Sequence, residues 1–199
     1  MISHIVAFLA MLNPFALFLY LEPLRKDLSH QAFRQVFIKA TLISYAISLA
    51  FLFTGDFIFE RVFQIHFEAF RVFGGIIIFS FAYLFIVKGQ KAFIQIKANL
   101  DDLASEIALP FMVGAGTISL AILLYRDMGL VDGAIALTIT FTLVCLIVLA
   151  LKGVRDAIEK KKFRTAFDKH MEILLRLNGF FLGSIGVNMV VLGVENLFL

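Results

Sequence analysis

Long apolar runs alternate with short charged segments along the whole chain. A membrane-spanning helix needs roughly 20 apolar residues, and each run has about this length. Helix tilt and charged flanking residues accommodate the small differences in length. The runs cover residues 2–21, 36–54, 72–87, 107–125, 133–151 and 177–194. This pattern predicts an all-α membrane protein with six transmembrane helices.

The fourth run contains residues that disturb a helix. Pro110 has no amide proton, so the carbonyl of Glu106 loses its helical partner. Gly114 and Gly116 each lower helix propensity by about 1 kcal/mol relative to alanine. Loosened backbone is tolerated in hydrocarbon only where protein or a water-filled cavity surrounds it. The run therefore favours a helix broken near mid-depth, and a continuous kinked helix that packs through small residues is the alternative.

The first run is interrupted in a similar way at Asn13-Pro14. Asn is a preferred N-cap and Pro is favoured at the first helical position, so a half-helix is expected to begin at Pro14. In the fourth run, Gly116 or Thr117 is expected to cap a second half-helix. Helix N-termini carry unpaired amides and partial positive charge that attract an anionic group. Because the freed carbonyls accept from an ammonium group, the two breaks together suit a small zwitterion.

The candidate substrate-binding residues are therefore the residues at the two breaks. They are Asn13, Pro14, Gly114, Ala115, Gly116 and Thr117. The glycines leave room for close backbone approach, and Gly116→Leu is expected to fill the site in a protein that still folds. Two alternatives remain open. Asn13 can anchor a neighbouring helix without any ligand, and the hydroxyls of Thr117 and Ser119 can bond back onto their own helix.

Small and polar residues also gather in the third and sixth runs. In the sixth run, Gly179, Gly183 and Gly186 fall at intervals of three or four, so one small, polar face is expected to line the bundle interior. Close packing is favoured over ligand contact for the glycines. The candidates for pathway or packing are Gly74, Gly75, Asn178, Gly179 and Asn188.

The two halves of the chain resemble each other in two places. MLNPFALFL in the first run resembles ALPFMVGAG in the fourth, and RVFGGIIIF in the third resembles RLNGFFLGS in the sixth. Each half has three crossings, which is an odd number, so homologous halves lie in opposite orientations. The sequence predicts two inverted three-helix repeats, 1–98 and 99–199, in one membrane domain with discontinuous first and fourth helices. This arrangement is common among secondary transporters.

The distribution of charge predicts the orientation. Of the 18 Lys and Arg residues, all but Arg61, Arg71 and Arg126 fall on one side of the predicted helices. That side is expected to be cytoplasmic, which places the basic loops inside and both termini outside. The basic residues lie between apolar runs, so the lipid bilayer is the expected surrounding and no nucleic-acid partner is predicted.

Enzymatic chemistry is not indicated. Asp, Glu, Lys and His are missing from the centre of every run, and the histidines lack a metalloprotease spacing. The single cysteine, Cys145, cannot form a disulfide or thiol relay within one chain. We expect no catalytic residue, no metal site and no cofactor. Any coupling to H⁺ or Na⁺ must use an end carboxylate, the substrate's own groups or backbone oxygens.

Four segments resemble the MarC family of small bacterial and archaeal inner-membrane proteins. They are LNPF at 12–15, RVFGGIIIF at 71–79, ALPFMVGAGTIS at 108–119 and RLNGFFLGSIGVNMVVLGV at 176–194. The resemblance covers nearly the whole chain. It implies six helices in two inverted triplets, an inner-membrane location, and cation-coupled transport of neutral amino acids such as glycine and alanine. An exporter of another small solute or drug and a non-transporting membrane scaffold are the alternatives.

The chain departs from the family pattern in two places. Shortly after Asn-Pro the family often has a glycine and a second proline, where this chain has Ala16 and Leu17. The family commonly has Gly-Pro-Gly where this chain has Gly114-Ala115-Gly116. These departures soften the breaks. They bear on the shape of the pocket, and so on the substrate, more than on the fold.

Overall fold

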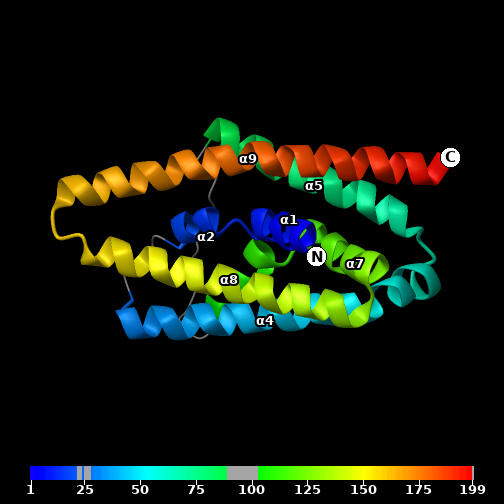
Figure 1. Ribbon diagram of the computed structural model, residues 1–199, viewed down its shortest axis with the longest axis horizontal. Coiled ribbons are helices and arrows are strands. Elements are labelled where there is room, and N and C mark those ends of the chain that lie inside the picture. The colour runs from blue at the N-terminus through cyan, green and yellow to red at the C-terminus, as the bar shows by residue number, and fades with distance from the viewer. Residues whose placement is uncertain (22–23, 25–27, 89–102, 199) are drawn as a thin grey trace.

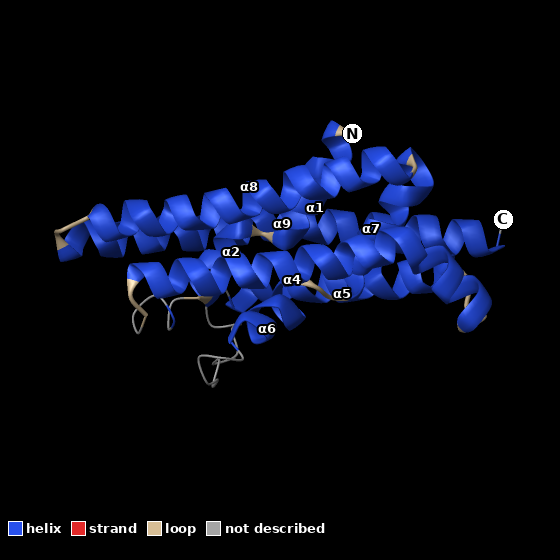
Figure 2. Cartoon of the chain, turned by 90° about the horizontal axis from the view of Figure 1, so that it is seen from below, coloured by secondary structure: helices blue, strands red, loops and turns tan. Residues whose placement is uncertain are grey.

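A computed structural model of the protein describes residues 1–21, 24, 28–88 and 103–198. Throughout these residues the regular structure is helical, without strands (Figures 1 and 2). The α-helices are α1 (Ile2–Leu12), α2 (Pro14–Tyr20), α4 (His30–Phe57), α5 (Phe67–Lys88), α6 (Leu103–Ile107), α7 (Ala115–Met128), α8 (Leu130–Ala157) and α9 (Lys161–Phe198). Two wider, π-type segments are η1 (Ile58–Val62) and η3 (Ala108–Met112).

The predicted all-α membrane class is confirmed. Five segments of the described chain are long and apolar enough to cross a membrane: Ile2–Leu19, His30–Gly55, Phe67–Lys88, Leu130–Ala157 and Lys161–Phe198. The fourth predicted crossing is divided among α6, η3 and α7, of 5, 5 and 14 residues, so none of its pieces reaches that length alone.

Two long antiparallel helices, α4 and α8, form one side of the molecule. Each has 28 residues. Their register is set by the Tyr45 hydroxyl, which lies 3.0 Å from Thr138 Oγ1, and by Leu52, which packs over Gly133. A Cβ built at Gly133 would lie 2.9 Å from Leu52 Cδ1, so a side chain there would push the helices apart.

A second antiparallel pair, α5 and α9, forms the opposite side (Figure 1). Gly75 and Gly186 bring their backbones together, because a Cβ on either glycine would lie 2.6–2.7 Å from the carbonyl oxygen of the other. Gly179 and Gly193 are placed one heptad to each side of Gly186 and also face α5. Small residues at such a seam let transmembrane helices approach closely. The predicted packing role of Gly75 and Gly179 is confirmed, and Gly74 is likewise buried.

The short helices α1, α2 and α7 lie between the two long pairs (Figure 1). One side of α2 packs toward α4 and α8, and another side packs toward α5 and α9. Leu17 belongs to an apolar cluster with Phe37 of α4 and Val144 of α8, whereas Phe18 and Leu19 belong to a cluster with residues of α5 and α9. Because both clusters exclude solvent, the segment after the first break is held on two sides.

One prediction about the sixth helix is wrong in part. Its small, polar residues do not share one inward face. The glycines face α5 and Asn178 faces α1, but Ser184 and Asn188 are exposed on the outer side of α9. Three- and four-residue intervals around a long helix define more than one stripe, and here the second stripe points away from the bundle.

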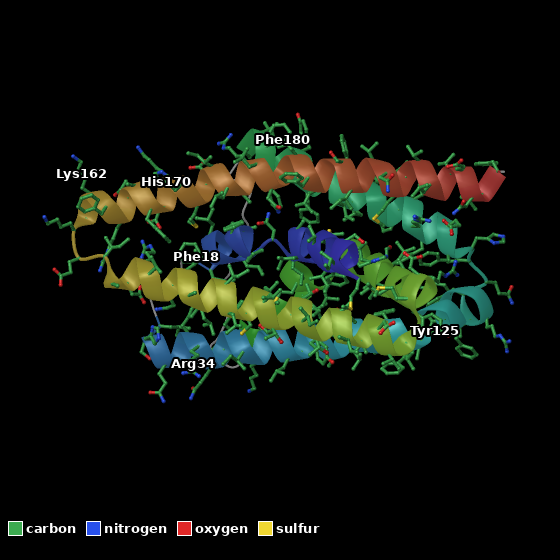
Figure 3. All side chains as sticks on the ribbon, viewed as in Figure 1. Phe18, Arg34, Tyr125, Lys162, His170 and Phe180 are labelled. Atoms are coloured by element: carbon green, nitrogen blue, oxygen red, sulfur yellow. The ribbon has the colours of Figure 1, made fainter. Side chains whose placement is uncertain are left out.

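Basic residues gather at one end of the bundle. There α4 begins and α8 meets α9, with Arg34 and Lys162 projecting outward (Figure 3). Tyr125 and both chain termini lie toward the other end (Figures 1 and 3). The antiparallel pairs α4 with α8 and α5 with α9 are compatible with inverted repeats. The repeat relation stays a prediction, and its boundary between residues 98 and 99 lies outside the described residues.

The glycine seam yields a stability prediction. Gly186→Ala places a methyl group 2.7 Å from the Gly75 carbonyl oxygen, so α5 and α9 must separate, and we expect a loss of about 1–3 kcal/mol in unfolding free energy. The matched control is Gly153→Ala on α8, where a Cβ meets nothing within 4 Å. Thermal unfolding in detergent should show a lower midpoint for the first variant only. Equal midpoints would contradict the seam.

Candidate functional site

The first predicted break is present at Asn13. The helix α1 ends at Leu12, Asn13 adopts a left-handed conformation with φ 44° and ψ 78°, and α2 begins at Pro14. The Asn13 side-chain oxygen accepts a hydrogen bond of 3.0 Å from the backbone amide of Ala16. Asn is among the few residues that tolerate this conformation. The predicted roles of Asn13 as N-cap and Pro14 as first helical residue are confirmed.

The carbonyl freed by Pro14 has a partner from a distant helix. In a continuous helix the Ala10 carbonyl would accept from residue 14, but proline has no amide proton. The Asn178 side-chain amide of α9 donates to this carbonyl at 2.9 Å. Asn178 thereby ties α9 to the break in α1. This contact could not be predicted from the sequence pattern, because the two residues are 168 positions apart.

The second predicted break is also present, with a different cap. Leu109 and Val113 have extended backbone dihedrals, and Gly114 is the residue before α7. Thr117 Oγ1 accepts from the Gly114 amide at 2.9 Å and donates to the Gly114 carbonyl at 3.0 Å. The prediction that Gly116 or Thr117 caps this half-helix is wrong. Thr117 reaches back three residues, as the third residue of a capping box does, so the helix begins earlier than predicted.

The two breaks lie side by side. A Cβ built at Gly116 would lie 2.3 Å from Cε of Met11 and 2.5 Å from Cγ1 of Ile78. Gly116 is therefore the point where α7 packs against α1 and α5. This corrects the expectation for Gly116→Leu, since a leucine would collide with packed side chains and disturb the fold as well as the site. The side chains of Ala115 and Pro110 lie outside the described residues.

Three buried polar groups near the breaks lack a hydrogen-bond partner among the residues that the structure describes. They are Asn13 Nδ2, Ser48 Oγ and Ser119 Oγ. Asn13 is 2% exposed, and the two serines are 1% or less. Other buried hydroxyls behave differently: Thr41, Ser44 and Thr140 each donate to the carbonyl four residues earlier. An unpaired buried polar group is costly, and such groups occur where a ligand or water binds.

Ser48 of α4 is level with the second break. The helices α4 and α7 run in the same direction (Figure 1), and a Cβ at Gly55 would lie 2.3 Å from Ile122 Cγ1. Seven residues earlier on both helices, Ser48 is opposite the start of α7. Sequence reasoning missed Ser48, since nothing in its local sequence distinguishes it from Ser44.

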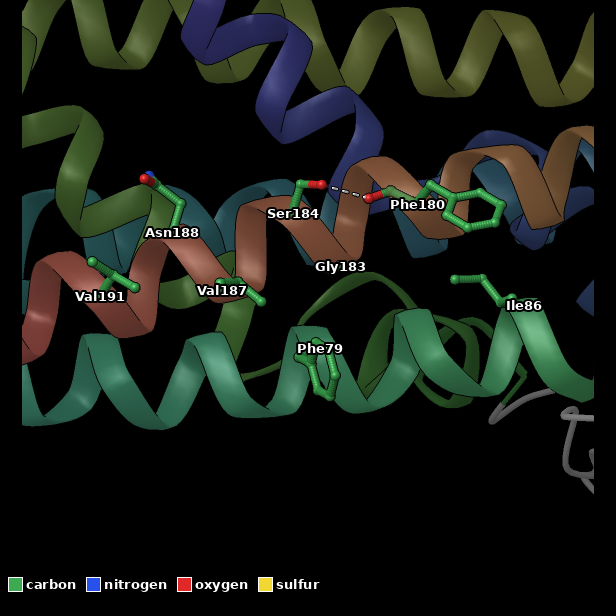
Figure 4. A pocket seen from close by; sticks show the side chains of 8 residues that line it. All are labelled: Phe79, Ile86, Phe180, Gly183, Ser184, Val187, Asn188 and Val191. Atoms are coloured by element: carbon green, nitrogen blue, oxygen red, sulfur yellow. Dashed lines mark hydrogen bonds between the residues drawn. The ribbon is translucent and has the colours of Figure 1, made fainter.

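The described residues contain no group of three or more His, Cys, Asp or Glu placed to hold a metal ion. Asn188, a candidate for pathway or packing, is not at the breaks. It lines an open groove of about 540 Å³ on the outer side of α5 and α9, together with Phe79, Ile86, Gly183 and Ser184 (Figure 4).

Ion pairs connect helices at each end of the bundle. At the end near Tyr125, Glu68 lies 3.3 Å from Arg71 and 3.8 Å from Arg126, and His4 lies 2.9 Å from Asp127. These contacts join α1, α5 and α7. Arg71 thus forms an ion pair with a carboxylate of its own helix.

At the basic end, Lys152 is buried. Its ammonium group lies 2.5 Å from Asp156, 3.5 Å from His30 Nδ1 and 5.3 Å from the ring centre of Phe33. These contacts join α8 to the start of α4. On α9, Arg176 donates to the Ile86 carbonyl at 2.8 Å, so it also binds protein.

Comparisons with known proteins agree with this architecture. A family model described as MarC family integral membrane protein matches residues 1–198. A UPF0056 membrane protein of Pyrococcus horikoshii is 27% identical over 203 residues, covering 100% of this chain and 95% of that protein. One from Aquifex aeolicus is 26% identical, covering 98% and 92%, and the UPF0056 membrane protein YvbG of Bacillus subtilis is 27% identical, covering 80% and 77%. No solved structure shows a significant match.

The hydrogen bond between α9 and the first break yields a second prediction. Asn178→Leu leaves the partly buried Ala10 carbonyl without its side-chain donor, so we expect the unfolding free energy to fall by about 1–3 kcal/mol. Ser184→Ala is the matched control on α9, since its exposed hydroxyl bonds only to the Phe180 carbonyl of the same helix. Thermal unfolding of both variants measures the difference, and an unchanged midpoint for Asn178→Leu would show that this bond is dispensable.

Proposed function

Because the chain belongs to the MarC family of integral membrane proteins, we propose that it is a secondary transporter of small neutral amino acids that works by alternating access. One observation carries the proposal. Two interrupted helices meet where Met11 contacts Gly116, and unpartnered polar groups are buried at and around their breaks. Discontinuous helices that meet inside the membrane form the binding sites of many secondary transporters.

The polar groups suit a zwitterion. The N-terminus of α7 lies at the second break, where its first-turn amides and partial positive charge favour a carboxylate. The Asn13 Nδ2 group is a further donor for a carboxylate oxygen. The hydroxyl oxygens of Ser48 and Ser119 can accept from an ammonium group. The proposed site thus offers donors for the carboxylate and hydroxyl acceptors for the ammonium group of one small molecule.

The packing around the breaks favours a small substrate. Ile78 and Met11 already occupy the space beside Gly116, so a bulky substrate side chain has little room there. Glycine and alanine fit this limit. Met11 is unbranched and flexible, and its terminal methyl group can move as substrate enters.

Alternating access requires each end of the bundle to open in turn. The pairs His4–Asp127 and Glu68–Arg126 join the two halves of the chain at one end, and Lys152 with Asp156 faces His30 at the other. The contacts His4–Asp127 and His30–Asp156 are partly exposed to solvent, and such pairs are individually weak, so they can break and re-form during transport. Binding energy from the substrate then shifts the balance between the two arrangements.

The remaining features of the proposal follow from charge and composition. We place the protein in the inner membrane with the basic end in the cytoplasm and both termini outside. We propose that transport is coupled to H⁺ or Na⁺. The proposal includes neither an enzymatic activity nor a cofactor. Export of a different small solute and a non-transporting scaffold are outcomes that the following experiments can detect.

Asn13→Gly separates binding from folding. Glycine adopts the left-handed conformation freely and caps a helix at a cost of only a few tenths of a kcal/mol, but it has no amide group. In liposomes containing the purified protein, we expect saturable uptake of labelled glycine and alanine, little uptake of lysine, and at least a tenfold loss with Asn13→Gly. A wild-type protein that carries none of these amino acids would overturn the proposed function.

Ser48→Ala and Ser119→Ala test the other side of the site. Each removes an unpartnered buried hydroxyl, so we expect unchanged or raised stability together with about tenfold weaker glycine binding. Ser44→Ala is the matched control, because Ser44 is equally buried on α4 but its hydroxyl bonds to the Ala40 carbonyl. Thermal-shift titration with glycine measures both quantities. Equal affinities in all three variants would remove the serines from the site.

A further inference from the structure

A regular stripe of residues runs along the outer side of α9. Its members are separated by intervals of four, three, four and three residues, and all are exposed: Leu177, Phe181, Ser184, Asn188 and Val191. We call this set the outer stripe. It lies on the face of α9 opposite the glycines that pack against α5 (Figure 4). Intervals of this kind are the pattern by which a helix packs along a second helix.

Asn188 is a polar residue on a surface of α9 that otherwise faces lipid. It lies within the apolar run of residues 177–194, and its amide forms no hydrogen bond with any part of the chain that the structure describes. Ser184 differs, because its hydroxyl donates to the Phe180 carbonyl at 3.0 Å. A polar side chain in hydrocarbon is stabilised by a hydrogen bond to another helix. Acyl chains offer neither a donor nor an acceptor, so the partner must be protein.

We propose that the outer stripe is the interface through which two copies of this chain form a parallel dimer. Copies inserted in one membrane have the same orientation, so their twofold axis runs along the membrane normal. Each residue near such an axis meets its own copy. Asn is self-complementary in this position, because its amide has both donors and an acceptor and two copies can bond reciprocally. The small side chain of Ser184, one turn away, allows the two backbones to approach.

The groove beside the outer stripe gives a dimer further contact. It is open to the outside and is lined by Phe79 and Ile86 of α5 and by Gly183 and Val187 of α9. Phe181 is 66% exposed and projects from the stripe, so the Phe181 of a second copy is an aromatic group of suitable size to enter an apolar groove. Ser184, Asn188 and Val191 of the outer stripe also line this groove, so the unpaired amide and the groove belong to one surface.

Cysteine cross-linking in native membranes tests the arrangement. In a Cys145→Ser background, Ser184→Cys and Val191→Cys each place one thiol on the outer stripe. Leu42→Cys is the control, because Leu42 is similarly exposed, at 60%, but belongs to α4. A parallel twofold dimer brings each stripe cysteine to its own copy, so mild oxidation should give a covalent dimer at 184 and 191 and little at 42. Equal cross-linking at all three positions, or none at the stripe, would overturn the proposal.

The role of Asn188 is tested separately by the full-length protein labelled for energy transfer and diluted in liposomes. Asn188→Val should weaken the dimer about 5- to 30-fold, the factor that corresponds to 1–2 kcal/mol of interhelical hydrogen bonding. Asn188→Gln should retain most of the affinity. Since Asn188 is exposed, thermal unfolding of the monomer should not change. A wild-type protein that stays monomeric, or a dimer unaffected by Asn188→Val, would contradict the proposal.

Discussion

The hydrogen bond from Asn178 to the Ala10 carbonyl is the interaction on which the rest of the site depends. A break inside a membrane helix frees backbone groups, and hydrocarbon offers them no partner. The Asn13 side chain satisfies one amide after the break, and Asn178 satisfies the carbonyl before it. Because α9 is also held against α5 by the contact of Gly75 with Gly186, the interrupted α1–α2 segment is attached to a rigid pair of helices.

The second break is supported differently and has a different consequence. Thr117 closes a short hydrogen-bonded turn on Gly114, which starts α7 without help from another helix. Gly116 then lets α7 lie against Met11, so the two breaks share one buried layer. Asn13 Nδ2 and Ser119 Oγ remain unpaired there. The structure satisfies the Ala10 carbonyl and the amides of Ala16 and Gly114, and it leaves a few side-chain groups for something else to bind.

Polar groups elsewhere in the chain divide into two kinds. Lys152, Glu68 and His4 form contacts between helices near the ends of the bundle, where charged side chains remain close to water. Asn188 lies on the outer surface within an apolar run and has no such contact in the described chain. The first kind holds the helices of one copy together at its ends, whereas the second kind is explained best by another copy.

The sequence by itself determined the membrane class, the positions of both interruptions, and the capping role of Asn13, because run length and capping depend on residues close together in the chain. It placed the cap of α7 incorrectly, since several small residues there have similar propensities. Only the tertiary structure decided that Asn178 binds Ala10, that Gly116 packs against Met11, that Ser48 lacks the partner Ser44 has, and that Asn188 points outward. These depend on how helices far apart in the sequence are rotated against one another, which hydrophobic periodicity leaves open.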